Sequence, residues 1–203
     1  STDAPPRFAA PTGAIMVLVA VTLSAMLLEG ASMDWSAIYM RNIFNPGPFL
    51  TGVAVACFAF SQATTRFFAD GFVEKHSPEI VARVLLVILL VGTLTVYFSP
   101  LPVLSLIGFA LCGVGTSAIF PLAMSAAAQR TDRPAVINVA ALAQNSFVIF
   151  LLGPPLLGGI AQAFGIRWSF GIGLPLIVLS FVLAGALGKK PVRAALPDPA
   201  PGE

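Results

Sequence analysis

Six long apolar stretches dominate the sequence and leave few folds open to it. A membrane-spanning helix needs about 20 mostly apolar residues to cross ~30 Å of hydrocarbon at ~1.5 Å per residue. Runs such as "VLLVILLVG" and "LIVLSFVLAGAL" lack the alternating polarity of a barrel strand. We therefore predict an all-α integral membrane protein with one bundle of six transmembrane helices, at Gly13–Met40, Phe49–Phe68, Val81–Phe98, Pro102–Ala128, Ala135–Phe164 and Trp168–Leu187.

The composition excludes several other classes of protein. Hydrophobic residues make up 57% of the chain and charged residues 10%, against roughly 45–50% and ~25% in soluble domains. A nucleic-acid partner would need a basic face on a soluble domain, so we expect none. One His, two Cys and nine scattered acidic residues show no metal-ligand spacing, and no phosphate loop or nucleophile elbow is present. We expect no metal, no cofactor and no enzymatic activity.

The basic residues predict how the bundle is oriented. Six spans place both termini on one side of the membrane, and only Arg41 and Arg167 fall on the other side. By the positive-inside rule both termini are expected to be cytoplasmic. We expect the membrane to be the plasma (inner) membrane. Trp35, Tyr39, Tyr97 and Trp168 would form an aromatic belt at the external surface. The remaining basic residues lie on the inner side: Arg7, Arg66, Lys75, Arg83, Arg130, Arg133, Lys189, Lys190 and Arg193.

The chain divides into three predicted parts. Residues 1–12 form a cytoplasmic N-terminal segment, which is either a native terminus or a linker between two halves of a larger protein. Residues 13–188 form the six-helix bundle. Residues 189–203 form a Pro-rich, disordered cytoplasmic tail.

Polar residues within the first, second, fourth and fifth spans predict a path for a polar solute. Polar groups in hydrocarbon are costly unless they face a bundle interior or a wet cavity. Breaks are expected at Leu28–Ser32, Ile119–Met124 and Leu151–Gly159, where Gly and Pro interrupt the spans, although close packing through small residues is an alternative. The candidate substrate- or ion-binding residues are Glu29, Gln62, Gln144 and Asn145.

Two acidic residues of the first span have different predicted roles. Glu29 lies ~24 Å along the helix from Gly13, inside the hydrocarbon. It is a candidate proton carrier or solute ligand, with capping of a broken helix at Gly30 as the alternative. Asp34 lies further out and is either an external gate residue or a surface ion-pair partner of Arg41. The amides of the fifth span bind either solute hydroxyls or a neighbouring helix.

A charged stretch, "RFFADGFVEKHSPEIVAR", separates the second and third apolar runs. Arg66 and Asp70 are four residues apart at the predicted cytoplasmic end of a helix. They can pair with each other or with groups on neighbouring helices, and a pair that exists in one state only would bias a conformational equilibrium. We expect these two residues to form a conformational switch. The alternative is an ordinary solvated loop.

The charged stretch resembles the loop that the major facilitator superfamily repeats between the second and third helices of each half. Asp70 matches that pattern, with Arg66 before it and Lys75 after it, whereas Ala69, Gly71 and the run "HSP" at 76–78 depart from it. Three further segments are similar to the fucose-permease-like branch: "EGASMDWSAIYM", "GFALCGVGTSAIFPLAMSAAAQ" and "LLGPPLLGGIAQAFGIRWSF". The chain thus resembles the C-terminal six-helix half of such a transporter.

The resemblance implies two six-helix bundles that rock around a central site and expose it alternately to either side. The expected function is secondary active transport of a small polar solute, with proton coupling as an option. Expected partners are the lipid bilayer, the solute, and an N-terminal six-helix half or a second copy. The alternative is a non-transporting assembly or sensor subunit that reuses the six-helix bundle.

Overall fold

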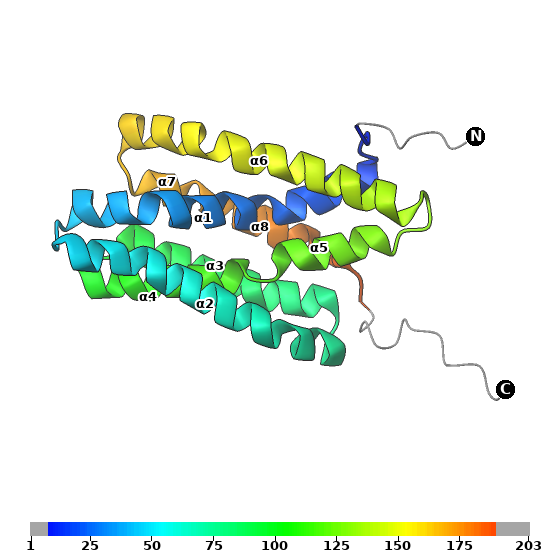
Figure 1. Ribbon diagram of the computed structural model, residues 1–203, viewed down its shortest axis with the longest axis horizontal. Helices are drawn as coiled ribbons and strands as arrows, with labels where there is room; N and C mark the ends of the chain where they lie inside the picture. Colours follow the sequence, from blue (N-terminus) through cyan, green and yellow to red (C-terminus); the bar gives the residue numbers. More distant parts are fainter. Residues whose placement is uncertain (1–7, 190–203) are drawn as a thin grey trace.

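The computed structural model describes residues 8–189, and its helices run along the long axis of a single bundle (Figure 1). Six helical segments are long and apolar enough to cross a membrane, which confirms the predicted number and order of spans. The described residues contain no strand. The elements are α1 (Gly13–Ile43), α2 (Pro48–Lys75), α3 (Pro78–Phe98), α4 (Pro102–Thr116), α5 (Ile119–Ala128), α6 (Ala135–Phe164), α7 (Trp168–Gly171), α8 (Gly173–Leu183) and the 3-10 helix η1 (Ala184–Leu187).

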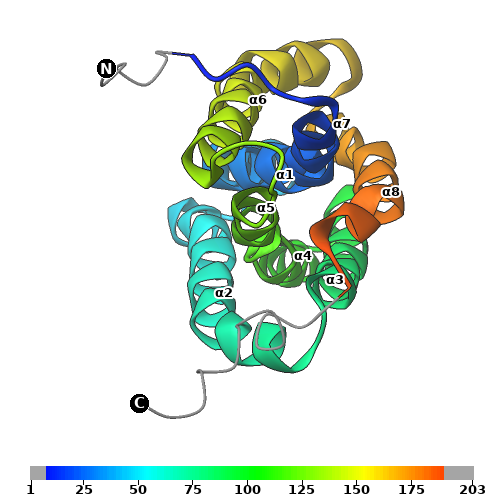
Figure 2. The same ribbon diagram turned by 90° about the vertical axis from the view of Figure 1, so that its right-hand side faces the viewer.

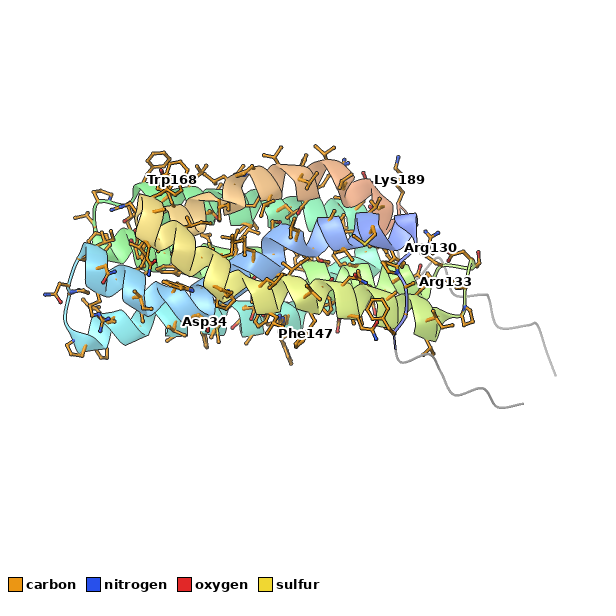
Figure 3. All side chains as sticks on the ribbon, turned by 90° about the horizontal axis from the view of Figure 1, so that it is seen from above. Asp34, Arg130, Arg133, Phe147, Trp168 and Lys189 are labelled. Carbon is orange, nitrogen blue, oxygen red and sulfur yellow. The ribbon has the colours of Figure 1, made fainter. Side chains whose placement is uncertain are left out.

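Most of the predicted N-terminal segment 1–12 and nearly all of the predicted tail 189–203 lie outside the described residues. Residues 8–12 precede α1, and the hydroxyl of Thr12 caps that helix by accepting a hydrogen bond from Ile15 N at 3.3 Å. The six spans alternate in direction. Figure 3 accordingly shows Arg130, Arg133 and Lys189 at one end of the bundle, called here the termini end, and Trp168 at the opposite end.

Most of the charged stretch Arg66–Arg83 is helical, and only His76 and Ser77 form a loop between two helices. Helix α2 continues to Lys75, seven residues beyond the predicted end at Phe68, and α3 begins at Pro78. A long helix that leaves the hydrocarbon keeps its backbone hydrogen bonds while its charged side chains reach water or headgroups. The Ser77 hydroxyl then starts α3 by accepting a hydrogen bond from Ile80 N at 3.3 Å.

None of the three predicted helix breaks lies where it was predicted, because Ile119–Met124 is helical within α5 and the one observed break comes just before it. Helix α1 continues through Leu28–Ser32, and α6 continues through Pro154 and Pro155. The spanning segment Pro102–Ala128 is interrupted at Ser117 and Ala118, between α4 and α5. Gly30 and Gly158 face the large aromatic side chains of other helices, Phe150 and Trp35 respectively. These glycines serve close packing, the alternative interpretation of the small residues.

Helices α2, α3 and α4 form a glycine-packed block, in which α4 lies between the other two (Figure 2). A Cβ atom built on Gly92 of α3 would lie 2.8 Å from the backbone nitrogen of Cys112 and 2.9 Å from the carbonyl of Gly108, both in α4. Gly113 of α4 approaches the backbone of α2 in the same way. Since lipid offers no hydrophobic driving force between helices, such close packing holds the block together.

Tyr39 is buried in the bundle and does not belong to an aromatic belt, contrary to the sequence-based prediction. Its ring makes edge-on contacts with Phe109 and Phe170, with centroids 5.6 Å apart in both cases. Its hydroxyl donates a 2.6 Å hydrogen bond to the carbonyl of Val96, near the end of α3. The phenol thus satisfies a backbone acceptor inside the bundle, whereas Trp168 remains half-exposed at the end opposite the termini.

Arg167 completes the end of α3. It donates hydrogen bonds to the carbonyls of Tyr97 at 2.5 Å and Ser99 at 2.7 Å. The last carbonyls of a helix have no partner within the helix, and a guanidinium can satisfy two of them at once. Its guanidinium also lies 5.8 Å from the Tyr39 ring centroid. Arg167 therefore has a structural role in joining α3 to the start of α7.

The glycine-packed block predicts a specific sensitivity to added methyl groups. We expect Gly92→Ala to destabilise the bundle by about 1–3 kcal/mol, because the new Cβ overlaps the backbone of α4 and the helices must separate. Thermal unfolding in detergent would show a lower melting temperature. Gly52→Ala is the matched control, since a Cβ on Gly52 of α2 meets no atom within 4 Å. Equal melting temperatures for the two variants would contradict the packing argument.

Candidate functional site

Glu29 lies near the middle of α1, sixteen residues after the first residue of a 31-residue helix. Because α1 is continuous there, the alternative that Glu29 caps a broken helix at Gly30 is wrong. The carboxylate forms an ion pair with Arg66 of α2, with 3.4 Å between Oε1 and Nη2. The Glu29 side chain is 22% exposed in the bundle. A carboxylate at this depth is therefore paired, as its position requires.

Arg66 connects three elements of the bundle. Besides its ion pair with Glu29, its Nε atom donates a 2.9 Å hydrogen bond to the carbonyl of Ser117. Ser117 stands at the break between α4 and α5, where helix carbonyls lose their regular partners. We call Glu29, Arg66 and Ser117 the arginine junction. Of the two partners predicted for Arg66, it contacts groups on neighbouring helices and not Asp70.

A cavity of about 480 Å³ opens beside the arginine junction, between α2 and α5. Arg66, Asp70 and Glu74 line it from α2, and Ser125 lines it from α5. The described residues offer Asp70 neither a salt bridge nor a side-chain hydrogen bond. The cavity therefore carries charges of both signs and a carboxylate that is available to a ligand or to a residue of a partner.

Gln62 bonds helix to helix in this structure. Its side chain is 8% exposed, and Nε2 donates to the Thr116 hydroxyl of α4 at 3.1 Å. Thr116 in turn donates to the carbonyl of Cys112. The amide thus satisfies a polar contact within the glycine-packed block and does not line the cavity beside Arg66.

The two amides of α6 also have partners within the chain. Gln144 accepts a hydrogen bond from the backbone nitrogen of Ala9 at 3.1 Å, and Asn145 donates to the carbonyl of Ala141 at 2.7 Å. The four predicted binding residues therefore do not converge on one point. Among them, Glu29 is the one that belongs to the arginine junction.

Asp34 is exposed, and among the described residues it forms no ion pair. The proposed surface pair with Arg41 is absent, although the two residues are seven positions apart on one helix. Figure 3 shows Asp34 and Phe147 on the same outward side of the bundle. Asp34 is thus available to groups outside this chain, and its predicted role as an external gate residue stays a prediction.

The sequence analysis missed a polar cluster between α5 and α6, which we call the loop clasp: Arg130, Asp132, Arg133 and Asn138. Arg133 donates to Asn138 Oδ1 at 3.2 Å and to the carbonyl of Ala10 at 2.8 Å. Asn138 donates to Asp132, which Arg130 binds with two nitrogens. The clasp therefore fastens the segment before α1 onto α6. The run "RTDRP" was the signal for it.

Asp132 remains ionised in the loop clasp. The hydrogen bonds from Arg130, and then from Asn138, lower the pKa of its carboxyl below the usual 3.8. A lowered pKa gives stability that is present above the ordinary value and is lost as the pH falls through the folded value. The clasp is therefore independent of pH across the physiological range.

The part of the chain that the structure describes has no group of three or more His, Cys, Asp or Glu residues placed to bind a metal.

The family model and the curated relatives that match this chain agree with one another. Residues 15–202 match the family model described as Major Facilitator Superfamily. The chain is 28% identical over 166 residues to an uncharacterized MFS-type transporter of Yersinia pestis, covering 82% of this chain and 43% of that protein. It is 29% identical over 177 residues to an uncharacterized transporter of Sinorhizobium fredii, covering 87% and 47% respectively. No solved structure matches the chain.

A third relative is the membrane protein MosC of Rhizobium meliloti, 24% identical over 141 residues, or 70% of this chain and 35% of that protein. The chain spans less than half the length of these curated relatives. The fucose-permease-like branch stays a prediction. The family match covers more than half of the residues, and the six apolar helices agree with it. The chain is an integral membrane protein that belongs to the Major Facilitator Superfamily, a family of membrane transporters.

Proposed function

We propose that this chain is one half of a secondary active transporter, which moves a small polar solute by alternating access with proton coupling. The proposal rests on the geometry of the arginine junction. There, an ion pair at membrane depth joins α1 to α2 and reaches the break between α4 and α5. Intramembrane charges are rare and mark substrate or proton pathways. Transport is the whole of the proposed activity, with no enzymatic step.

Proton coupling would act through Glu29. When the carboxylate takes up a proton it becomes a neutral acid, and Arg66 keeps its hydrogen bond to Ser117 but loses its ionic partner. The two states of the junction then differ in their links between α1 and α2. A ligand or proton shifts a conformational equilibrium by its differential affinity for the two states. Release of the proton on the other side restores the ion pair.

The solute would enter the cavity beside Arg66. Its volume of about 480 Å³ lies within the ~300–1,000 Å³ common for small-molecule sites. We assign Asp70 to the conformational switch, because it lines this cavity one turn after Arg66 on α2 and has no ion-pair partner in the described chain. Its carboxylate would bind Arg66 or a residue of a partner half in one state only.

The second half would cover α2 and α6. In the apolar 18-residue segment of each span, only 17% of the residues of α2 and 22% of those of α6 are buried in the bundle. In α1 the share is 61%. Helix α2 also has the lowest mean hydropathy of the six spans. A helix that faced lipid would be the most apolar, so this surface fits a protein partner better than lipid. We propose an N-terminal six-helix half as that partner, with a second copy as the alternative.

The proton-coupling proposal predicts the behaviour of Glu29→Gln. An amide keeps the shape of the side chain but cannot carry a proton, so we expect concentrative uptake driven by a pH gradient to fall about tenfold or more. Exchange of labelled solute, which needs no net proton movement, should continue. Uptake into proteoliposomes of the assembled protein, with a transported solute found by screening, would measure both.

Glu79→Gln is the matched control for that experiment. Glu79 forms an ion pair with Arg83 at 2.9 Å within α3, away from the arginine junction. It should leave both uptake and exchange close to those of the unsubstituted protein. Full accumulation by Glu29→Gln would return Glu29 to a structural role, and loss of folded protein in Glu29→Gln but not in Glu79→Gln would do the same.

We further propose that both termini are cytoplasmic, because the described Lys and Arg residues are concentrated at the termini end. A cysteine in place of Thr131, exposed between α5 and α6, should react with an impermeant thiol reagent from the cytoplasmic side alone. A cysteine in place of Asn42, exposed at the end of α1, should react from the outside alone. The native Cys57 and Cys112 lie within spans and provide the background. Reversed labelling would overturn the orientation.

The partner proposal predicts that this chain alone is incomplete. In mild detergent it should form dimers or aggregate, since α2 and α6 expose apolar and polar side chains together. Co-expression with an N-terminal six-helix half should give a one-to-one complex by light scattering, and solute uptake only then. A chain that is monomeric, monodisperse and active by itself would contradict the proposal.

A further inference from the structure

An apolar groove of about 370 Å³ lies between α2 and α3, next to the polar cavity along α2, and Ala69 lines both. The two helices contact each other little and are joined mainly through α4, whose Val114 forms the floor of the groove. Apolar side chains form almost the whole of its walls. The lining includes Phe68 and Phe72 from α2, and Ile80, Val84 and Ile88 from α3.

The length of the groove matches one leaflet of a bilayer. From Ile80 to Ile88 it follows α3 for eight residues, or ~12 Å along the helix axis. The hydrocarbon of one leaflet is half of ~30 Å. The groove starts at His76, where α2 ends, and runs from the termini end toward the middle of the membrane. The length of the groove along α3 is therefore close to the thickness that one acyl chain spans in a leaflet.

The position of the groove makes it accessible to lipid. Helix α3 has the highest mean hydropathy of the six spans, and its side chains Val84, Val87 and Val91 are about half-exposed on one face. That face continues from the groove along α3. The side of α2 that carries Asp70 and Glu74 lines the polar cavity instead. A protein partner on the polar side of α2 would thus leave the groove open to the bilayer.

The end of α2, where the groove begins, carries an exposed cation that is not itself among the lining residues. Lys75 is exposed beside His76 at the end of α2. The nearby acids do not oppose it, because Glu74 faces the polar cavity and Glu79 is buried and paired with Arg83. A cation at the level of the headgroups attracts anionic lipids.

We propose that this groove is a binding site for an anionic phospholipid of the leaflet at the termini end. One acyl chain lies between α2 and α3, and the phosphate headgroup contacts Lys75 and His76. The lipid would separate the two helices at this end, where they lack direct packing. It would also support the turn of α2 that carries Asp70 and Glu74 on its other side.

The test uses tryptophan reporters in the assembled protein, reconstituted with phospholipids brominated on the acyl chain. Val84→Trp places a reporter in the groove, and Val91→Trp places one two turns further along the same exposed face, outside the groove. We expect brominated phosphatidylglycerol to quench the Val84→Trp signal with about fivefold higher apparent affinity than brominated phosphatidylcholine. The Val91→Trp signal should show no preference. The native Trp35 and Trp168 also fluoresce, and their contribution is measured in the protein that carries no reporter.

The contribution of Lys75 to the lipid preference is tested by removing single charges from the Val84→Trp protein. Lys75→Gln should abolish the preference for phosphatidylglycerol, whereas Arg41→Gln, which removes an exposed cation at the opposite end, should leave it unchanged. Equal quenching at Val84 by the two lipids would show an ordinary boundary lipid and overturn the site. A preference that also appears at Val91, or that survives Lys75→Gln, would overturn it as well. Each outcome is independent of whether Glu29 couples protons.

Discussion

The hydrogen bond from Arg66 to the carbonyl of Ser117 is the contact on which the arrangement of the bundle depends. In hydrocarbon a freed carbonyl has no water to bind, and irregular backbone is tolerated only where protein groups satisfy it. The break between α4 and α5 therefore requires a donor from another helix. Arg66 supplies one through Nε, and its Nη2 reaches Glu29 of α1. The same guanidinium satisfies the backbone and holds the only carboxylate at the middle of α1.

Arg167 plays a comparable part at the opposite end, where it satisfies the last carbonyls of α3. The two arginines differ in one respect. Arg167 is bound to carbonyls and an aromatic ring, and no acid among the described residues pairs with it. Arg66 combines a carbonyl with a carboxylate that can be neutralised. The guanidinium of Arg167 is thus held by carbonyls and an aromatic ring, whereas that of Arg66 is held by a carbonyl and a carboxylate.

The sequence predicted the six spans and their order because apolar length is a local property. It misplaced the end of α2, since charged residues such as Asp70 and Glu74 read as a loop although they continue a helix. It predicted breaks at Leu28–Ser32 and Leu151–Gly159, where packing against neighbouring helices keeps α1 and α6 continuous. It selected both Glu29 and Arg66 but could not pair them, because that contact joins residues 37 positions apart on different helices.

Because of the break at Ser117 and Ala118, α5 is a separate short helix that would tilt about the break relative to α4. Helix α4 is fixed by close backbone contact within the glycine-packed block, while the ten residues of α5 extend ~15 Å beyond it toward the termini end. A tilt of ten degrees at the break would displace the far end of such an arm by ~2.6 Å, about the radius of the helix backbone. The loop clasp is attached to that far end and holds the segment entering α1. A small change of angle beside Arg66 would therefore displace the far end of α5 and, through the loop clasp, the start of the first helix.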